Sequence, residues 1–346
     1  MMHSPFRYPG GKSDFLGIAK HVFEECGLVG KPLVEPYAGS AAVSLGLLDF
    51  GLTPHVTLVE RDPLLYCFWK ALFTRTDEFI TRFQELEITL DTWHKLRPLL
   101  ALDQPAESDL VACGLAALFF NRTNFSGILN AGPIGGHGQK SKYKIDCRTN
   151  KDDLIGRLLA MAMFEDRVDV VFGDAVEFIE RSKDASEAVF YLDPPYFSKG
   201  DLLYRYYYRL KQHKSLAAAL GSASFWWFLS YDDHHVIEYL YEDFFVQRLD
   251  FRYSARKVVQ RTELLISNFS TPVMVDVGEA IPRRARGARP ANSQAAVLVP
   301  HAVMLRELTL ITALSRGQAG SGASGAPRAT GRVTTELGDE FWRKVV

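Results

Sequence analysis

An acid, two prolines and an aromatic residue follow one another in Asp193-Pro194-Pro195-Tyr196, directly after an apolar run at residues 188–192. Each proline ring fixes its own φ at about −65°, and Pro195 keeps Pro194 out of the right-handed helical region. The Asp193 carboxylate and the Pro194 carbonyl are then two acceptors held side by side, next to the flat face of Tyr196. An exocyclic amine on a planar heterocycle would satisfy all three groups. Taken alone, the four residues could also be a proline-stiffened turn with an incidental acid.

A second group of residues is typical of a nucleoside-binding site. The small-residue segment Glu35-Pro36-Tyr37-Ala38-Gly39-Ser40 ends another apolar run. A ligand could approach the backbone closely there, and the start of the following helix would favour a carboxylate. The next two apolar runs end at acids, Glu60 and Asp174, and an acid after the second strand commonly binds ribose hydroxyls. A tight structural turn is the alternative for the segment alone. No G-x-G-x-x-G occurs in it, so a pyrophosphate is not indicated.

Cations interleaved with aromatic residues and amides occur in four further segments. Their candidate binding residues are Tyr8, Gly11 and Lys12 near the N-terminus, Arg122 and Asn124 in Asn121-Arg122-Thr123-Asn124-Phe125-Ser126-Gly127, Lys140, Lys142 and Lys144 around Tyr143, and Arg205 after the tetrapeptide. Paired glycines and a lysine suit a carboxylate or a phosphate. Cations beside aromatic rings suit a nucleic-acid backbone and an unstacked base. A solvated lysine loop is the alternative for residues 140–144.

The composition narrows the class of protein. The chain has 346 residues, 47% of them hydrophobic, which is enough for a sizeable core. Its formal net charge is −1, so an anionic partner must be met by local clusters of cations. Four cysteines lie far apart, which argues against a disulfide framework or a zinc ribbon, and no metal site is expected. No apolar run reaches the length of a membrane span and no signal pattern opens the chain, so we expect a cytoplasmic protein with no membrane partner.

Alternating strands and helices must position these residues. Strands are predicted at residues 33–37, 55–60, 168–172, 188–192, 225–231 and 264–269, and helices at 41–50, 63–73, 174–182, 215–220 and 232–241. This alternation predicts an α/β fold with an open, mainly parallel sheet. In such sheets ligands bind at the carboxyl ends of the strands, near the point where the strand order reverses.

Two regions depart from the alternation. Residues 76–149 have helical patterns, including an apolar helix at 110–120, followed by a loop rich in Gly and Lys. We expect this region to be a recognition module inserted into a discontinuous domain of residues 1–75 and 150–276. Residues 277–346 are rich in Arg, Gly, Ser and Ala. They are predicted to form a largely flexible tail with a short helix near residues 302–314.

Over roughly residues 5–270 the motifs resemble, in order, those of the Dam-type DNA adenine N6-methyltransferases. The resemblance is carried by Tyr8-Pro9-Gly10-Gly11-Lys12, Glu35-Pro36-Tyr37-Ala38-Gly39, Glu60, Asn121-Arg122-Thr123-Asn124-Phe125-Ser126-Gly127, Asp193-Pro194-Pro195-Tyr196 and Glu263-Leu264-Leu265. It implies a Rossmann-like sheet of the S-adenosylmethionine-dependent methyltransferases with a mainly helical target-recognition insertion at residues 76–149. It also implies methyl transfer from S-adenosylmethionine to N6 of a flipped adenine in DNA.

The resemblance also implies a role for each candidate residue. Tyr8, Gly11, Lys12 and the turn formed by Glu35, Pro36, Tyr37, Gly39 and Ser40 would surround the methionine end of the cofactor. Glu60 would bind its ribose and Asp174 its adenine. Asp193 and Pro194 would accept the hydrogens of the target amine while Tyr196 stacks on the base. Arg122, Asn124, Lys140, Lys142, Lys144 and Arg205 would contact DNA.

Other acceptors and partners stay open at this point. The same slot could present a cytosine N4, an RNA base or a protein glutamine to the cofactor, or the chain could be a catalytically silent DNA-binding relative. The basic insertion favours a polynucleotide, and the acid at the first position of the tetrapeptide favours adenine. A cognate restriction endonuclease is a possible partner, in the cytoplasm of a prokaryotic or phage-infected cell.

Overall fold

The computed structural model describes residues 4–7, 15–198, 205–255 and 257–272. Tyr8, Gly11 and Lys12 lie outside these ranges, and so do the expected tail at residues 277–346 and its helix near 302–314. No helix in the described part of the chain has the length and apolar character that crossing a membrane requires.

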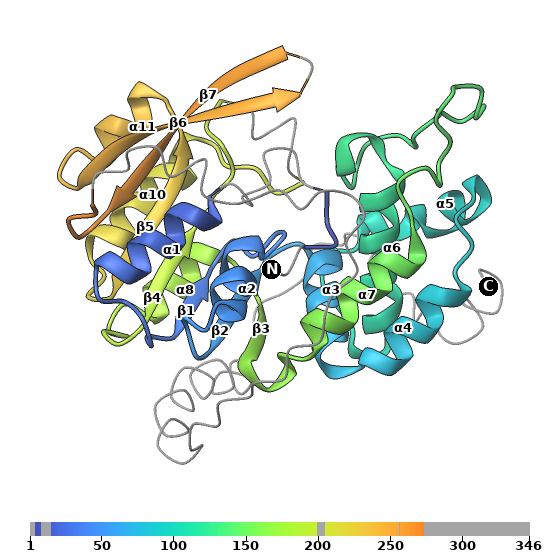
Figure 1. Ribbon diagram of the computed structural model, residues 1–346, viewed down its shortest axis with the longest axis horizontal. Coiled ribbons are helices and arrows are strands. Elements are labelled where there is room, and N and C mark those ends of the chain that lie inside the picture. The colour runs from blue at the N-terminus through green and yellow to red at the C-terminus, as the bar shows by residue number, and fades with distance from the viewer. Residues whose placement is uncertain (1–3, 8–14, 199–204, 256, 273–346) are drawn as a thin grey trace, which may run out of the picture. The chain divides into compact units, whose positions relative to one another are not determined.

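Seven strands form one sheet in the order β3-β2-β1-β4-β5-β7-β6 (Figure 1). Their bounds are β1 (Leu33–Glu35), β2 (Val56–Glu60), β3 (Val168–Phe172), β4 (Val189–Leu192), β5 (Trp226–Asp232), β6 (Phe245–Ala255) and β7 (Lys257–Ser267). Strands β1 to β5 run parallel, whereas β7 is antiparallel to both β5 and β6. Strands β1, β2 and β4 are buried along their whole length, as expected for parallel strands covered on both faces. The predicted Rossmann-like α/β fold is confirmed.

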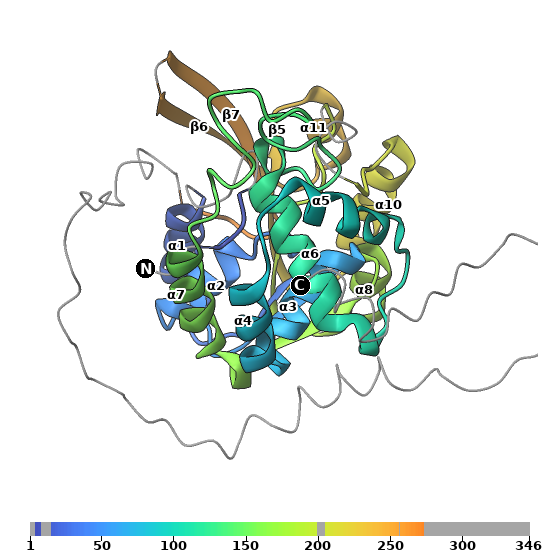
Figure 2. The ribbon, with the colours of Figure 1, turned by 90° about the vertical axis from the view of Figure 1, so that its right-hand side faces the viewer.

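Helices cover both faces of the sheet. Helices α1 (Leu16–Glu25) and α2 (Ala42–Asp49) pack together on one side, and α8 (Ala175–Arg181) and α10 (Leu210–Gly221) pack together on the other (Figure 2). The short helix α11 (His235–Leu240) follows β5. This double covering leaves the ends of the strands as the places where a ligand can reach the sheet.

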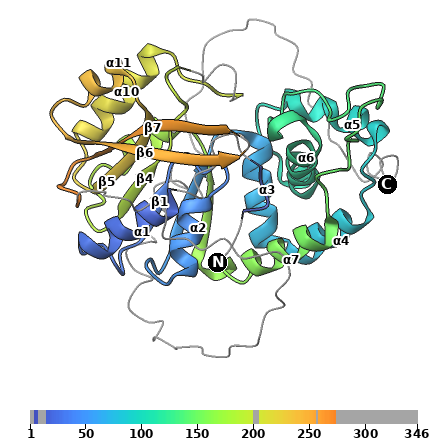
Figure 3. The ribbon, with the colours of Figure 1, turned by 45° about the horizontal axis from the view of Figure 1, so that its top comes forward.

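Between β2 and β3 the chain forms α3 (Pro63–Thr74), α4 (Thr76–Glu85), α5 (Leu90–Leu96), α6 (Leu110–Thr123) and α7 (Lys151–Ala162) (Figure 3). Helix α3 begins with a side-chain cap from Asp62 and with Pro63 at its first position, both favourable at a helix start. Helix α6 is buried almost all round, which identifies it as the central helix of this segment. It packs closely against α3 and also contacts α4.

The sequence patterns missed several elements. Helices α1 and α7 were not predicted, and α10 begins at Leu210, five residues before the predicted start. The strand expected at 264–269 is the end of the long β7, which pairs with the unpredicted β6. This hairpin is rich in charged residues, including Arg252 and Arg261. A strand whose sequence mixes charged with apolar residues lacks the continuous apolar run that marked the parallel strands.

Candidate functional site

Two of the acids selected from the sequence lie where the strand order reverses. Strand β1 lies between β2 and β4, so the chain winds toward β2 and β3 on one side and toward β4 and β5 on the other. Glu35 is the last residue of β1, and Asp193 directly follows β4. Both acids are therefore at the carboxyl edge of the sheet at its switch point, where open α/β sheets bind ligands.

The tetrapeptide and the two residues after it are held from the neighbouring strands. Ser230 Oγ of β5 donates to Asp193 Oδ1 at 3.1 Å. The Tyr196 hydroxyl donates to Glu263 Oε1 of β7 at 2.9 Å. The backbone N–H groups of Phe197 and Ser198 donate to the two carboxylate oxygens of Asp232, each at 2.9 Å. The segment that leaves β4 is thus fixed on the β5 and β7 side.

Tyr196 lies deeper than its expected stacking role suggests. Its side chain is only 3% exposed, and its hydroxyl is bonded to the buried Glu263. The ring forms part of the packed wall behind the tetrapeptide in this structure. Stacking of Tyr196 on a base stays a prediction.

The turn after β1 is unusually tight. Gly39 and Ala41 both adopt a left-handed backbone, with φ of 46° and 47°, and Ala41 is the cap of α2. The turn is tied to β2 and α3, because Gly39 N–H donates to Glu60 Oε2 at 2.9 Å and Gly39 C=O accepts from Trp69 Nε1 at 3.0 Å. Because Gly39 has no side chain, a ligand can approach the backbone of this turn closely.

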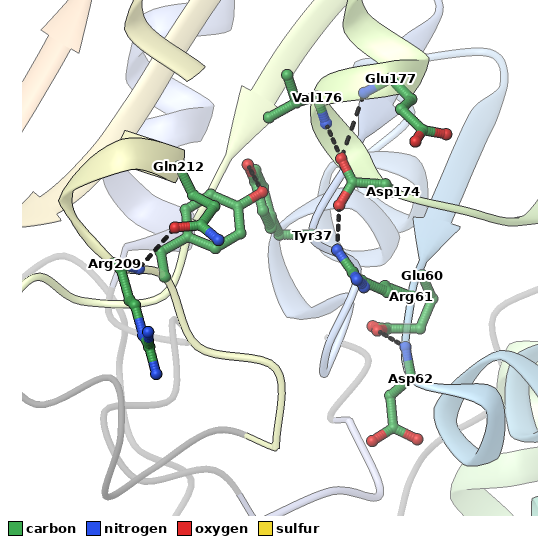
Figure 4. A network of polar contacts seen from close by, with 10 residues as sticks. Tyr37, Glu60, Arg61, Asp62, Asp174, Val176, Glu177, Arg209 and Gln212 are labelled. Carbon is green, nitrogen blue, oxygen red and sulfur yellow. Dashed lines mark hydrogen bonds and ion pairs between the residues drawn. The ribbon is translucent and has the colours of Figure 1, made fainter. Parts of the chain in front are cut away.

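The acids that follow β2 and β3 also have structural partners (Figure 4). Glu60 Oε1 accepts from the Asp62 N–H at 2.8 Å, so both of its oxygens bind backbone donors. Burial raises the pKa of Glu60 to about 7. Asp174 Oδ1 caps α8, and its Oδ2 pairs with the Arg61 guanidinium. Asp174 Oδ1 accepts from the N–H groups of both Val176 and Glu177, at 2.9 and 3.3 Å, whereas Asp174 Oδ2 and the two oxygens of Glu60 can each accept a further hydrogen bond.

Glu35 is a buried acid with an unmatched oxygen. It is 3% exposed, and its Oε2 has no hydrogen-bond partner among the described residues. Burial, with a smaller contribution from the nearby negative charges of Asp193 and Glu60, raises its pKa to about 8. Three carboxylates in one low-dielectric region favour a cationic ligand.

Aromatic side chains from the segment after the tetrapeptide reach the same edge. The Tyr208 hydroxyl lies 2.9 Å from that of Tyr37, which follows β1. Figure 4 shows Tyr37 between the Asp174–Arg61 pair and Gln212. The Tyr206 ring faces the Arg61 and Arg205 guanidinium groups, each 5.3 Å from its centroid.

The two arginines expected to contact DNA have hydrogen-bond partners within the chain. Arg205 donates to the Leu102 carbonyl at 2.6 Å and lies 3.5 Å from Asp62 Oδ1. Arg122 donates to the carbonyls of Arg148 and Pro5, the latter at 3.1 Å. Burial lowers the pKa of Arg122 to about 10. These contacts tie both side chains to the fold, and their binding to DNA stays a prediction.

The amides at the end of α6 have similar internal roles. Asn121 accepts from the Arg7 N–H at 2.7 Å and donates to the Arg7 carbonyl at 2.9 Å. It therefore holds the segment that precedes Tyr8. Asn124 is fully buried, where it accepts from Trp93 Nε1 at 2.6 Å and donates to the Leu129 carbonyl at 2.7 Å. Its amide faces the interior of the insertion.

The loop after α6 presents the exposed groups of the insertion. The Lys140 and Lys142 side chains are exposed, and Lys144 donates to the Gln139 carbonyl. Tyr143 is 58% exposed and Phe125 is 70% exposed. Phe125 was not selected from the sequence, although a lone aromatic ring among polar turn residues was the available signal. Ser230 and Asp232 were also missed, because their roles depend on how β5 pairs with β4.

No group of three or more His, Cys, Asp or Glu side chains in the described ranges could hold a metal ion. The polar groups at this edge are carboxylates, hydroxyls and backbone groups. Buried carboxylates gathered in this way suit a cationic ligand.

The chain was compared with solved structures, with curated proteins and with models of protein families. Several solved structures are similar at low identity. One is a protein of Pyrococcus horikoshii described provisionally as an RNA methyltransferase, 13% identical over 76% of this chain and 83% of that one, with a TM-score of 0.36. Another is a protein of Escherichia coli described provisionally as a methyltransferase, 11% identical over 78% and 90%, with a TM-score of 0.34. An rRNA methyltransferase of Streptomyces viridochromogenes is 12% identical over 73% and 84%, with a TM-score of 0.28.

No curated protein matches the chain significantly. Residues 8–254 match the model of the family described as D12 class N6 adenine-specific DNA methyltransferase. This match spans well over half of the sequence and includes the turn after β1, the insertion and the tetrapeptide. The chain therefore belongs to the D12 class of N6 adenine-specific DNA methyltransferases.

Proposed function

We propose that the protein transfers a methyl group from S-adenosylmethionine to N6 of an adenine flipped out of DNA. The observation that carries the proposal is the Asp193 carboxylate at the switch point of the sheet, bonded to Ser230 and beside the buried acids Glu35 and Glu60. Residues 1–75 and 150–276 would form the catalytic domain, and residues 76–149 would recognise the target.

The residues at the edge fit the proposed cofactor. S-adenosylmethionine carries a cationic ammonium group and a cationic sulfonium group, which suit a cluster of buried acids. Glu35 Oε2, without a partner among the described residues, is the atom best suited to the ammonium group. The turn formed by Pro36, Tyr37, Gly39 and Ser40 would pass beside the methionine part, with Tyr8, Gly11 and Lys12 as further candidates. Glu60 would accept from the ribose hydroxyls, and Asp174 would accept from the adenine amine.

Bound S-adenosylmethionine would supply an electrophilic methyl group. The N6 lone pair of adenine is delocalised into the ring, so the amine is a poor nucleophile. Asp193 and the Pro194 carbonyl would accept its two hydrogens and raise the electron density on nitrogen. These hydrogen bonds strengthen as positive charge develops on N6, so they favour the transition state. Asp193 would take the released proton directly or through water.

The target adenine must leave the helix to reach this site, because N6 is paired and stacked in duplex DNA. Lys140 and Lys142 are exposed cations that could bind phosphates. The exposed rings of Phe125 and Tyr143 offer apolar faces to unstacked bases. A restriction endonuclease of the same sequence specificity is the proposed partner, since methylation would protect the host DNA from it.

Substitution of Asp193 tests the proposal. Asp193→Ala should abolish transfer of tritiated methyl groups to DNA, while calorimetry still detects binding of S-adenosylmethionine. Mass spectrometry of DNA modified by the wild-type protein should find N6-methyladenine, and parallel reactions with RNA and protein should remain unlabelled. Asp184→Ala removes an exposed acid before β4 and should keep full activity. Near-wild-type transfer by Asp193→Ala would overturn the proposed mechanism.

A further inference from the structure

Two buried hydroxyl groups form a hydrogen-bonded chain behind Asp193. Ser230 Oγ donates to Asp193 Oδ1 at 3.1 Å, and the Tyr191 hydroxyl lies 3.2 Å from Ser230 Oγ. Tyr191 and Ser230 are both completely buried. The chain therefore runs from the interior of the sheet to the acid at its edge.

The register of the sheet creates this arrangement. Tyr191 and Asp193 are two residues apart, so their side chains lie on the same face of the extended chain. The parallel pairing aligns Tyr191 with Phe228 and Leu192 with Leu229. Continuing this register by one residue brings Ser230 beside Asp193. The contact between Ser230 and Asp193 thus follows from the pairing of β4 and β5 rather than from a mobile loop.

The direction of the hydrogen bonds is also determined. An ionised carboxylate only accepts hydrogen bonds, so Ser230 must donate its single hydrogen to Asp193. The Tyr191 hydroxyl must then donate to Ser230. Burial raises the pKa of the Tyr191 phenol well above its ordinary range, so the phenol keeps the hydrogen that it donates. Hydrogen bonds in such a chain polarise and strengthen one another.

We propose that Ser230 is a positioning residue for methyl transfer, whose hydroxyl, oriented by Tyr191, fixes the rotation of the Asp193 carboxylate toward the target amine. The inference rests on the proposed function of Asp193. Ser230 and Tyr191 touch neither substrate nor cofactor in this scheme. They act through the carboxylate, and Asp232 and Glu263 fix the backbone and the ring that follow it.

Ser230→Ala tests this role, because loss of a positioning residue should lower kcat and leave KM nearly unchanged. Without the donor, the carboxylate can rotate away from the amine, and kcat should fall by about 10- to 100-fold, the scale expected for a small misplacement of a reacting group. KM for DNA and the affinity for S-adenosylmethionine should stay within about twofold, because Ser230 contacts neither. The acidic limb of the pH profile of kcat should move to higher pH, since the ionised acid loses a hydrogen bond.

Two further variants separate orientation from packing. Ser230→Cys keeps a weak donor of similar size and should retain an intermediate kcat. Tyr191→Phe should lower kcat less than Ser230→Ala, because the Ser230 hydroxyl can still donate to the acid. The double variant should be no slower than Ser230→Ala alone, as expected when one residue acts only through the other.

Ser267→Ala is the matched control. Ser267 is also a completely buried serine of the sheet, on β7, and its hydroxyl donates to the Phe269 carbonyl at 2.7 Å. Its loss should lower thermal stability but leave kcat and the pH profile unchanged. A kcat for Ser230→Ala within about twofold of wild type would overturn the inference. An unshifted pH profile, or additive effects of Ser230→Ala and Tyr191→Phe, would also overturn it.

The proposed function and this inference fail in different ways. Absence of N6-methyladenine in DNA treated with the wild-type protein would overturn the proposed function, and the inference with it. An active wild-type enzyme whose kcat is insensitive to Ser230→Ala and Tyr191→Phe would overturn the inference alone. Because Tyr191→Phe and Ser230→Cys preserve volume, they decide the question even where Ser230→Ala does not fold.

Discussion

At the scale of single residues, the site gathers buried acids whose ionisation is suppressed before any ligand binds. Burial raises the pKa of Glu35 to about 8 and that of Glu60 to about 7. Near neutral pH the ligand-free protein therefore holds Glu35 largely protonated and Glu60 as a mixture of its protonated and ionised forms. A cationic ligand reverses the balance, because it favours the ionised form of each acid. Cofactor binding and proton release should be linked.

The pH dependence of cofactor affinity tests this linkage. The pKa of Glu35 in the folded protein lies above its ordinary value of 4.5, so the ligand-free site holds a proton that a cation must displace. Affinity for S-adenosylmethionine should therefore fall as the pH drops from about 8 to about 6, by at most about tenfold per pH unit for each linked group. Calorimetry at pH 6.5 in two buffers of different ionisation enthalpy should detect the released proton.

Glu35→Gln separates this group from the other acids. The amide cannot ionise, so the variant should release fewer protons and show a flatter pH dependence of affinity. Glu187→Gln changes an exposed acid with a side chain 74% exposed and should behave as wild type. Equal proton release by wild type and Glu35→Gln would show that Glu35 is not linked to the cofactor.

At the scale of secondary-structure elements, the sequence predicted the parallel strands and the acids at their ends, because buried parallel strands are continuous apolar runs bounded by polar residues. It did not predict Ser230 as the partner of Asp193, since that contact depends on the register between β4 and β5. Nor could the sequence distinguish Arg122 and Arg205 from Lys140. The two arginines donate to backbone carbonyls of the chain, whereas Lys140 is exposed. A cation bonded within the fold and a cation exposed to solvent look the same in the sequence. Only tertiary packing distinguishes the two.

The packing of α6 against α3 depends on a glycine. A Cβ atom added at Gly114 would lie 2.9 Å from both the Cys67 carbonyl oxygen and the Phe68 Cα. Because both neighbours are backbone atoms, Gly114→Ala must push the two helices apart. The free energy of unfolding should fall by about 1–3 kcal/mol, as for other overpacked cores. Urea denaturation followed by circular dichroism measures the change.

Gly156 provides the control for helix propensity. It lies on the exposed side of α7, where an added Cβ would meet nothing within 4 Å. Gly156→Ala should raise the free energy of unfolding by up to about 1 kcal/mol, because alanine favours the helix more than glycine does. If both variants changed stability by the same amount and in the same direction, the close approach of α3 and α6 would not be the cause.

At the scale of the whole molecule, a formal net charge of −1 must be reconciled with a polyanionic substrate. The cations predicted to bind DNA occupy two kinds of position in the described part of the chain. Arg122 and Arg205 donate hydrogen bonds to backbone carbonyls of the chain. Lys140 and Lys142 are exposed in the loop after α6, beside Tyr143. DNA affinity should therefore depend on a few local groups and on salt rather than on the overall charge.

The double substitution Lys140→Ala and Lys142→Ala tests this division. Each lost phosphate contact removes released counterions, so the slope of log K for DNA against log salt should become shallower by about two. Affinity for S-adenosylmethionine should be unchanged, because neither lysine lies among the acids at the strand ends. Lys183→Ala removes an exposed cation before β4, at the opposite edge of the sheet, and should preserve the slope. An unchanged slope in the double variant would mean that the DNA phosphates are bound elsewhere, since the remaining counterion release would have to come from other cations of the chain.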